Sequence, residues 1–410
     1  MAAGGRGTRG RTDTPPAPSP PEPLCGPPPE RVWCCTPALF IWLSGRPRGV
    51  IEAPAGGMEG AGGRPAPGPF FSCRCFYTDN IFLEDFRLHV RSTEPQLESI
   101  LRSKGCKTEE QFRKVQAKID EEVQRRKLLH QKSLERRSII SACYKPLNPA
   151  VYVLQESFLA PEFHEIVAYC RSEDADFEGL LDRIHSLPAE RVYSIPVFTK
   201  QFCDQLIREL ENFEQSEMPK GRPNTMNNYG VLLNELGFDE TFITPLREDY
   251  LQPITSLLYP DYGGCRLDSH KAFVVKYAVN QDRDLCFHYD NAEVTLNVSL
   301  GKDFGEGNLC FGDMRQIPTD ERECVEIEHR VSYGLLHRGQ HCHGALPISS
   351  GERWNLIIWM RSSPVRNELC PMCNKKPELI EAAGFGDGFT SELSDVWQEH
   401  QEKVNACSLS

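Results

Sequence analysis

The chain has 410 residues with a formal net charge of −12, and 40% of its residues are hydrophobic. This composition is ordinary for a globular protein with a sizeable core, and the length predicts two or three domains. Such an acidic chain is a poor match for a phosphate backbone, and no apolar run reaches the roughly 20 residues of a membrane helix. We therefore expect neither nucleic acid nor a membrane among its partners.

Residues 1–69 are rich in Gly, Pro, Ala and Arg, and this composition predicts disorder. Their apolar island, residues 32–43, follows a Pro-rich stretch and is interrupted by Pro37, so it is a poor signal peptide. The 17 scattered cysteines favour reduced thiols in an intracellular compartment. We expect a cytoplasmic or nuclear protein, with the secretory pathway as the alternative, and Met58 is an alternative start of translation.

Residues 70–188 are predicted to form a mostly helical N-terminal region. A long helix is expected over residues 108–138, where Thr108 and Gln111 offer a capping box at its start. Another helix is expected over residues 163–170. The charged face of the long helix fits a solvated helix surface better than a partner-docking arm, because such charge patterns are common on packed helices.

Residues 189–363 have a β-rich pattern. A strand at 191–198 precedes Thr199, which can cap a helix, and another helix is expected over 246–258. Further strands are expected over residues 272–277, 293–300, 308–311, 324–329, 331–336 and 354–360. Short strands separated by turn signals predict a sandwich, barrel or jelly roll, and the helices around it make the class α+β. Residues 364–410 are interpreted as a C-terminal tail.

Two histidines and an aspartate in this β-rich region are candidate metal ligands. His288 and Asp290 are two residues apart, so in a strand both point to the same face. His343 follows just over fifty residues later and offers a third ligand. Two histidines and one carboxylate on one face of a metal form the facial triad of non-haem Fe(II) oxygenases.

Arg353 lies ten residues after His343, at the start of an apolar strand. A guanidinium held there can pair bidentately with a carboxylate inside a dry barrel. Each signal also has an ordinary alternative: a hydrogen-bonded surface pair for His288 and Asp290, a satisfied core histidine, and a surface arginine. Their order and spacing within one region favour a joint site.

Residues 191–363 resemble the 2-oxoglutarate- and Fe(II)-dependent oxygenases, in particular the prolyl and lysyl hydroxylase branch. The pattern of that branch is His-x-Asp, then His-x-x-x-Pro, then Gly-x-Lys/Arg. The matching positions are His288 and Asp290, His343 and Pro347, and Gly351 and Arg353. The resemblance implies a double-stranded β-helix (jelly-roll) core with supporting helices, so that residues 189–363 form the dioxygenase domain.

The resemblance also implies roles for individual residues. His288, Asp290 and His343 would bind Fe(II) as the catalytic group, and Arg353 would pair with the distal carboxylate of 2-oxoglutarate. Tyr277 occupies a strand on which relatives often place a tyrosine that hydrogen-bonds this cosubstrate.

Three more side chains are open to two interpretations. Thr295 and Asn297 share a polar strand face, which fits either the inner lining of the cosubstrate site or a solvated face. His341 faces the same way as His343, but the His-x-x-x-Pro spacing favours His343 as the ligand.

The implied activity is that of a dioxygenase which uses Fe(II), 2-oxoglutarate and dioxygen, with ascorbate as reductant, and releases succinate and carbon dioxide. The expected substrate is a protein side chain of the proline or lysine type. One alternative is an inactive binding module that keeps the jelly roll and the metal site. Another is a zinc-dependent hydrolase of the cupin kind, in which Arg353 would be dispensable.

Cys370 and Cys373 form a Cys-x-x-Cys motif in the tail. This motif could be half of a zinc site, but no second Cys-x-x-Cys occurs at the spacing of a zinc ribbon. Free thiols in a C-terminal loop are therefore the favoured interpretation.

Overall fold

The computed structural model describes residues 70–315 and 324–382. The predictions for residues 1–69, including Met58 as an alternative start, and for residues 383–410 lie outside the described residues. Within the described ranges, no helix combines the length and the apolar character needed to cross a bilayer.

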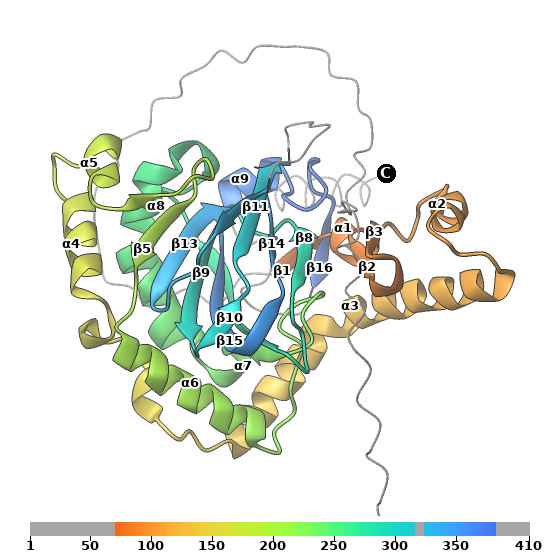
Figure 1. The fold of residues 1–410 in the computed structure, drawn as a ribbon, viewed down its shortest axis with the longest axis horizontal. Coiled ribbons are helices and arrows are strands. Elements are labelled where there is room, and N and C mark those ends of the chain that lie inside the picture. The colour runs from red at the N-terminus through yellow and green to blue at the C-terminus, as the bar shows by residue number, and fades with distance from the viewer. Residues whose placement is uncertain (1–69, 316–323, 383–410) are drawn as a thin grey trace, which may run out of the picture.

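Two antiparallel sheets form the centre of the fold (Figure 1). The larger, eight-stranded sheet contains, in spatial order, β4 (His185–Ser186), β5 (Tyr193–Pro196), β13 (Tyr333–Arg338), β9 (Val294–Gly301), β15 (Ile348–Arg361), β7 (Ser269–Ala278) and β6 (Gly230–Leu232), with β10 (Phe304–Glu306) paired to β15. The smaller sheet contains β12 (Val325–Ile327), β11 (Leu309–Met314), β14 (His341–Ala345) and β8 (Leu285–His288). This is the predicted jelly-roll core, and each of the six strands listed for residues 272–360 corresponds to an observed strand.

Alternating side chains of the larger sheet face two different cores. Val294, Leu296 and Val298 of β9 point outward into a cluster with the helices, whereas Phe273 and Ile357 point inward toward the smaller sheet. This alternation follows from the two-residue period of a strand. Polar side chains on the inward face are therefore enclosed between the two sheets.

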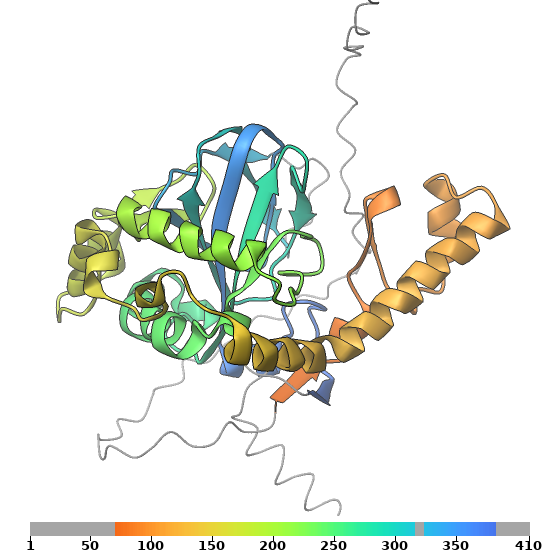
Figure 2. The same cartoon turned by 90° about the horizontal axis from the view of Figure 1, so that it is seen from below.

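Helices cover the outer face of the larger sheet (Figure 2). The hydroxyl of Thr199 accepts the Phe202 amide at 3.3 Å and caps α6 (Lys200–Gln215), as predicted. The predicted helix 246–258 is a π-helical turn, Leu246–Leu251, that continues into α8 (Gln252–Leu258). The remaining helices of this part are α4 (Pro161–Cys170), α5 (Phe177–Leu181), α7 (Leu233–Leu236) and α9 (Ser363–Glu368).

Helix α3 (Glu109–Cys143) begins at the predicted capping box and projects from the jelly roll (Figures 1 and 2). Its inner end contacts α7, where Arg136 donates to both carboxylate oxygens of Glu235. Its outer end packs with α2 (Leu97–Ser103) and the hairpin of β2 (Ile81–Leu83) and β3 (Leu88–Val90) in a separate hydrophobic cluster. The same helix therefore connects two cores.

The two ends of the described chain pair with each other. Strand β1 (Phe70–Cys73) is antiparallel to β16 (Leu379–Ala382), and α1 (Cys75–Thr78) follows β1 directly. Residues of the predicted N-terminal region and of the predicted tail thus share one small sheet.

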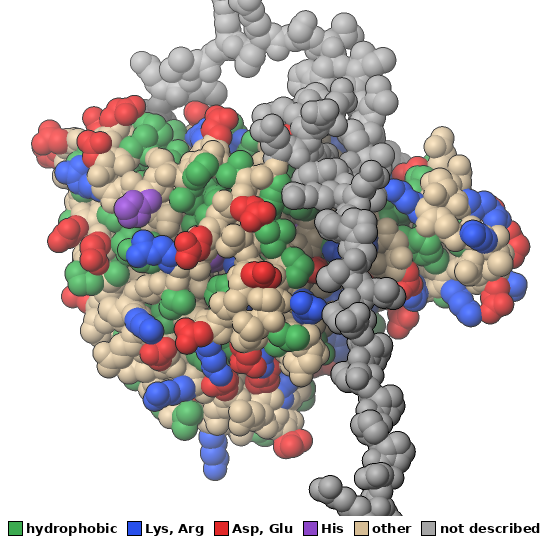
Figure 3. Space-filling model, viewed as in Figure 1, with side chains coloured by type: hydrophobic (Ala, Val, Ile, Leu, Met, Phe, Trp, Pro, Cys, Tyr) green, Lys and Arg blue, Asp and Glu red, His purple; other side chains and the backbone are tan. Residues whose placement is uncertain are grey.

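The state of the cysteines and the distribution of surface charge are two further features of the fold. Cys310 and Cys324 form a disulfide, which differs from the expectation of reduced thiols, while cysteines such as Cys73, Cys75, Cys370 and Cys373 are not in a disulfide. Acidic and basic side chains are interspersed on the face seen in Figure 3.

Candidate active site

Strand pairing brings the three candidate metal ligands together. His288 ends β8 and lies opposite His343 of β14 in the register of the smaller sheet, and Asp290 follows two residues later. The Nε2 atoms of His288 and His343 lie 3.5 and 3.6 Å from the Asp290 carboxylate oxygens. One potential ligand atom from each residue falls within 4.8 Å of the others. A divalent ion can therefore contact all three residues from one point.

Backbone carbonyls orient both imidazoles. The Nδ1 atom of His288 lies 2.8 Å from the Cys286 carbonyl, and that of His343 lies 2.9 Å from the His341 carbonyl. Each carbonyl requires a proton on Nδ1, so the neutral ring presents a lone pair on Nε2. The second contact explains part of the sequence pattern: His341 contributes its backbone to the site, while its own Nε2 contacts the Gly312 carbonyl at 2.7 Å.

Asp290 is almost fully buried and is held in its ionised form. Burial alone would raise the pKa of its carboxyl, but the His343 and His288 imidazoles lower that pKa below its usual value. The Thr295 hydroxyl donates to the same carboxylate at 2.7 Å. Burial lowers the pKa of His343 well below its usual range, so this ring is neutral at neutral pH. The carboxylate of Asp290 and the neutral ring of His343 are in the protonation states that a metal requires.

Thr295 thus contacts the aspartate, although the sequence suggests it as a cosubstrate contact. His337 also lies beside Asp290, and the sequence did not indicate it. It is fully buried on β13, and its Nε2 lies 4.0 Å from an Asp290 oxygen without a hydrogen bond. Its position opposite Thr295 in the β13–β9 register is the feature that places it there.

Arg353 is a fully buried cation on the inward face of β15. Its guanidinium donates to the Asn355 side chain at 3.0 Å, to the Gly307 carbonyl and to Nδ1 of His329 at 3.1 Å. In the part of the chain that the structure describes, these acceptors are all neutral and no carboxylate pairs with Arg353. Burial lowers the pKa of the guanidinium to about 10, so it remains charged at neutral pH.

Tyr277 and Asn297 surround this cation. Tyr277 lies directly opposite Arg353 in the β15–β7 register, with the guanidinium 5.8 Å from the centre of its ring. The Asn227 amide lies 3.4 Å from the Tyr277 hydroxyl. Asn297 accepts a hydrogen bond of 2.7 Å from Asn355, which itself accepts from Arg353.

One cavity of about 180 Å³ connects the ligand triad with Arg353. The predicted residues that line it are His288, Asp290, His343, Arg353, Tyr277, Thr295 and Asn297. Its wall also includes Asn80 and His89 from the N-terminal region and Met372 from the tail, none of which the sequence indicated. Only the long-range packing of β1, β16 and α3 brings these segments to the cavity, so no local pattern could have identified them.

The chain is similar to several known proteins. A family model described as an OGFOD2-like domain matches residues 140–264. A protein of Xenopus tropicalis, named 2-oxoglutarate and iron-dependent oxygenase domain-containing protein 2, is 58% identical over 84% of this chain and 99% of its own length. The human procollagen-lysine,2-oxoglutarate 5-dioxygenase 1 is 29% identical over 45% of this chain and 25% of its own length. A solved prolyl-4-hydroxylase of Pseudomonas putida matches with a TM-score of 0.32 and 15% identity, over 43% of this chain and 95% of that chain.

The motifs, the jelly roll and these relatives define the class as the 2-oxoglutarate- and iron-dependent oxygenases. Within this class, the chain belongs to the family of 2-oxoglutarate and iron-dependent oxygenase domain-containing protein 2, because it covers nearly all of a relative that is more than half identical.

Proposed function

We propose that this chain is an Fe(II)- and 2-oxoglutarate-dependent dioxygenase that hydroxylates a protein side chain of the proline or lysine type. The observation that carries the proposal is the buried, charged Arg353, which pairs with no carboxylate of residues 70–315 and 324–382 and lies in the same cavity as the His288, Asp290 and His343 triad. An unpaired buried cation is costly unless an anion pairs with it, and a dicarboxylate supplies that anion.

The residues present fit both iron and 2-oxoglutarate. His288, Asp290 and His343 would hold the metal through two neutral nitrogens and one carboxylate, a set that leaves coordination positions open. Arg353 would bind the distal carboxylate of 2-oxoglutarate, with Tyr277 beside it. Iron and 2-oxoglutarate bound by these residues would supply the oxidation, in which dioxygen is consumed, 2-oxoglutarate becomes succinate and carbon dioxide, and a substrate C–H bond becomes C–OH.

The protein's own residues prepare the site for this chemistry. The carbonyls of Cys286 and His341 fix the ring orientation, and Thr295 fixes the carboxylate. The apolar walls from Leu309 and Ile357 keep the cavity dry, which strengthens the interaction of Arg353 with an anion. Ascorbate as reductant follows from the class, and the human lysyl relative supports a side-chain substrate.

The first test separates metal binding from cosubstrate binding. Binding of Mn²⁺ and then of 2-oxoglutarate is measured by calorimetry for the wild type, Arg353→Gln and His343→Ala. We expect Arg353→Gln to keep the metal but bind 2-oxoglutarate roughly 100-fold more weakly, because a charge-assisted contact of about 3 kcal/mol is lost. His343→Ala should lose the metal, whereas His341→Asn, two residues away on β14, should keep both ligands.

The second test separates the enzyme from an inactive binding module that keeps the jelly roll and the metal site. Succinate formation is measured with Fe(II), 2-oxoglutarate, dioxygen and ascorbate, in the presence of proline- and lysine-containing peptides. An enzyme shows succinate release that both His343→Ala and Arg353→Gln abolish, together with the gain of one oxygen atom in a peptide. Ligand binding without turnover identifies the binding module, and equal turnover in all variants rejects the proposed active site.

A further inference from the structure

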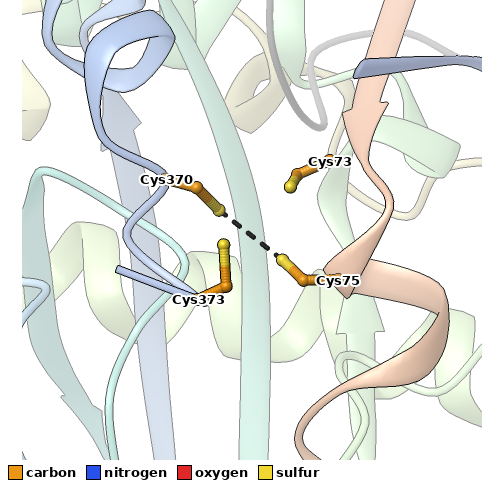
Figure 4. A group of neighbouring side chains, drawn as sticks. All are labelled: Cys73, Cys75, Cys370 and Cys373. Atoms are coloured by element: carbon orange, nitrogen blue, oxygen red, sulfur yellow. Dashed lines mark hydrogen bonds between the residues drawn. The ribbon is translucent and has the colours of Figure 1, made fainter. Parts of the chain in front are cut away.

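Four cysteines from the two ends of the described chain meet at one point outside the oxygenase cavity. Cys73 ends β1 and Cys75 begins α1, while Cys370 and Cys373 lie in the loop that follows α9. Figure 4 shows the two pairs facing each other, with their sulfur atoms directed toward a common centre. Cys73 and Cys75 are thus the second pair of thiols beside the Cys-x-x-Cys motif of the tail. The sequence did not reveal this pair, because its spacing is Cys-x-Cys.

The distances between the sulfur atoms suit a single tetrahedral metal ion. All four lie within 4.8 Å of one another, and those of Cys75 and Cys370 are 3.6 Å apart. A zinc ion bound to sulfur at about 2.3 Å separates its thiolates by about 3.8 Å. A disulfide would need a separation of about 2 Å, and all four residues are free cysteines.

The backbone holds the two pairs in place independently of the sulfur atoms. The pairing of β1 with β16 is extended by the Arg74 amide, which donates to the Glu378 carbonyl at 2.7 Å. After Cys373, Asn374 adopts a left-handed conformation with φ of 57°, and the chain turns back so that the Cys370 amide donates to the Lys375 carbonyl at 2.8 Å. The thiols are therefore arranged in advance for a shared ligand.

The surroundings are those of a closed, structural metal site. Cys73, Cys75 and Cys370 are buried, Cys373 is partly buried, and apolar side chains including Phe71 and Leu379 pack around them. Four thiolates that leave no open position are typical of structural zinc, whereas a catalytic zinc keeps one position for water. We propose that Cys73, Cys75, Cys370 and Cys373 bind one structural Zn²⁺ ion, separate from the ion of the oxygenase site.

This ion would link β1, α1 and the loop after α9 to the wall of the active-site cavity. Pro371, inside the Cys-x-x-Cys loop, accepts a hydrogen bond of 2.7 Å from Arg315. The next carbonyl, that of Met372, accepts from Asn80 at 3.2 Å. Met372, Asn80 and Arg315 all line the cavity. Zinc would therefore fix the position of the loop that forms part of the cavity wall.

The test measures metal content by mass spectrometry in full-length protein that is produced with zinc and purified without chelators. We expect one zinc per chain in the wild type and in His343→Ala, because the cysteine site does not depend on the oxygenase ligands. Cys370→Ser and Cys73→Ser should each lose the zinc. Cys265→Ser, which removes an exposed free thiol, should retain it and serves as the matched control.

A second measurement does not depend on the folding of the cysteine variants. Wild-type protein reconstituted with Co²⁺ should show the intense near-ultraviolet charge-transfer absorption of a tetrahedral tetrathiolate site. The proposal is overturned by wild-type protein without stoichiometric zinc and without this absorption, by zinc that His343→Ala abolishes and Cys370→Ser retains, or by iron in place of zinc. None of these outcomes depends on oxygenase activity, so the cysteine site and the proposed function succeed or fail separately.

Discussion

At the scale of single residues, the arginine in the cavity depends on a neutral histidine. His329 accepts a hydrogen bond from Arg353 at Nδ1, while its Nε2 lies 3.2 Å from the Tyr333 carbonyl. Burial, and then the charge of Arg353, lower the pKa of His329 to about 3. A proton on Nδ1 would remove the acceptor and place a second positive charge beside the guanidinium. A neutral His329 therefore leaves the guanidinium of Arg353 as the only charge within this hydrogen-bonded pair.

This histidine makes stability depend on pH in a defined direction. Unfolded His329 takes up a proton below a pH of about 6.5, but folded His329 does so only near pH 3. Stability is therefore lost as the pH falls from about 6.5 toward 3, and the loss between pH 7.5 and 5.5 is about 1 kcal/mol from this residue. His329→Asn keeps an acceptor but does not titrate. We expect urea denaturation to show a loss between these pH values that is smaller in His329→Asn by that amount.

The comparison of the wild type with His329→Asn also controls for the other histidines. Other buried histidines titrate equally in the wild type and in the variant, so their contribution cancels in the difference. Identical losses in both proteins would show that His329 is not a buried neutral acceptor.

At the scale of elements, one side chain of α3, that of Arg126, binds the backbone of α1 and of the segment that joins α1 to β2. Arg126 is 3% exposed and donates to the carbonyls of Phe76, Asp79 and Asn80 at 2.9, 2.7 and 2.9 Å. It also pairs with Glu122 at 2.8 Å. These carbonyls belong to the segment that carries Asn80 to the cavity wall, so the helix positions part of the site.

Replacement of Arg126 by Met should release this segment. Three partly buried carbonyls would lose their donor and Glu122 would keep only Arg125, so we expect a local destabilisation of about 3 kcal/mol. Hydrogen exchange over residues 75–90 should accelerate accordingly, while exchange in β9 should stay unchanged. Arg125→Met is the matched control, because within residues 70–315 and 324–382 the guanidinium of Arg125 bonds to Glu122 and to no backbone carbonyl. Equal acceleration in both variants would assign the effect to the Glu122 pair instead.

At the scale of the whole molecule, the N-terminal region has a hydrophobic core that is separate from the cores on the two faces of the larger sheet. The cluster around Ile119 of α3 includes Ile81, Leu83 and Leu101, and it does not merge with the large cluster between the jelly roll and its helices. A core that shares few contacts with its neighbour can unfold on its own. The N-terminal core and the rest of the fold should therefore give two thermal transitions.

A pair of core variants tests this separation. Ile119 is completely buried in the smaller cluster, and Leu296 is completely buried in the larger one. Each change to Ala should cost about 3 kcal/mol through lost burial and the resulting cavity. By calorimetry, Ile119→Ala should lower only the transition of the smaller core, and Leu296→Ala only the other. A single transition that both variants lower equally would indicate one cooperative unit.

Features that depend on nearby residues could be predicted from the sequence, whereas features that depend on distant residues could not. The α6 cap at Thr199, the capping box of α3 and the six listed strands were predictable, because they depend on neighbours within a few residues. Strand β14 was not predicted, since its polar sequence of His341–Ala345 lacks β-branched residues. Thr295 was assigned to the cosubstrate, and only the structure shows its hydrogen bond to Asp290.

The sequence by itself indicated the class of protein through its resemblance to a known family, and it indicated the β core and four candidate site residues, because spacing along a strand decides which side chains share a face. The tertiary structure alone decided that His337 lies beside Asp290, that Asn80 and Met372 form the cavity wall, and that Cys73 and Cys75 meet Cys370 and Cys373. These contacts join residues separated by tens to hundreds of positions, and they arise from strand pairing and core packing, which no local pattern specifies.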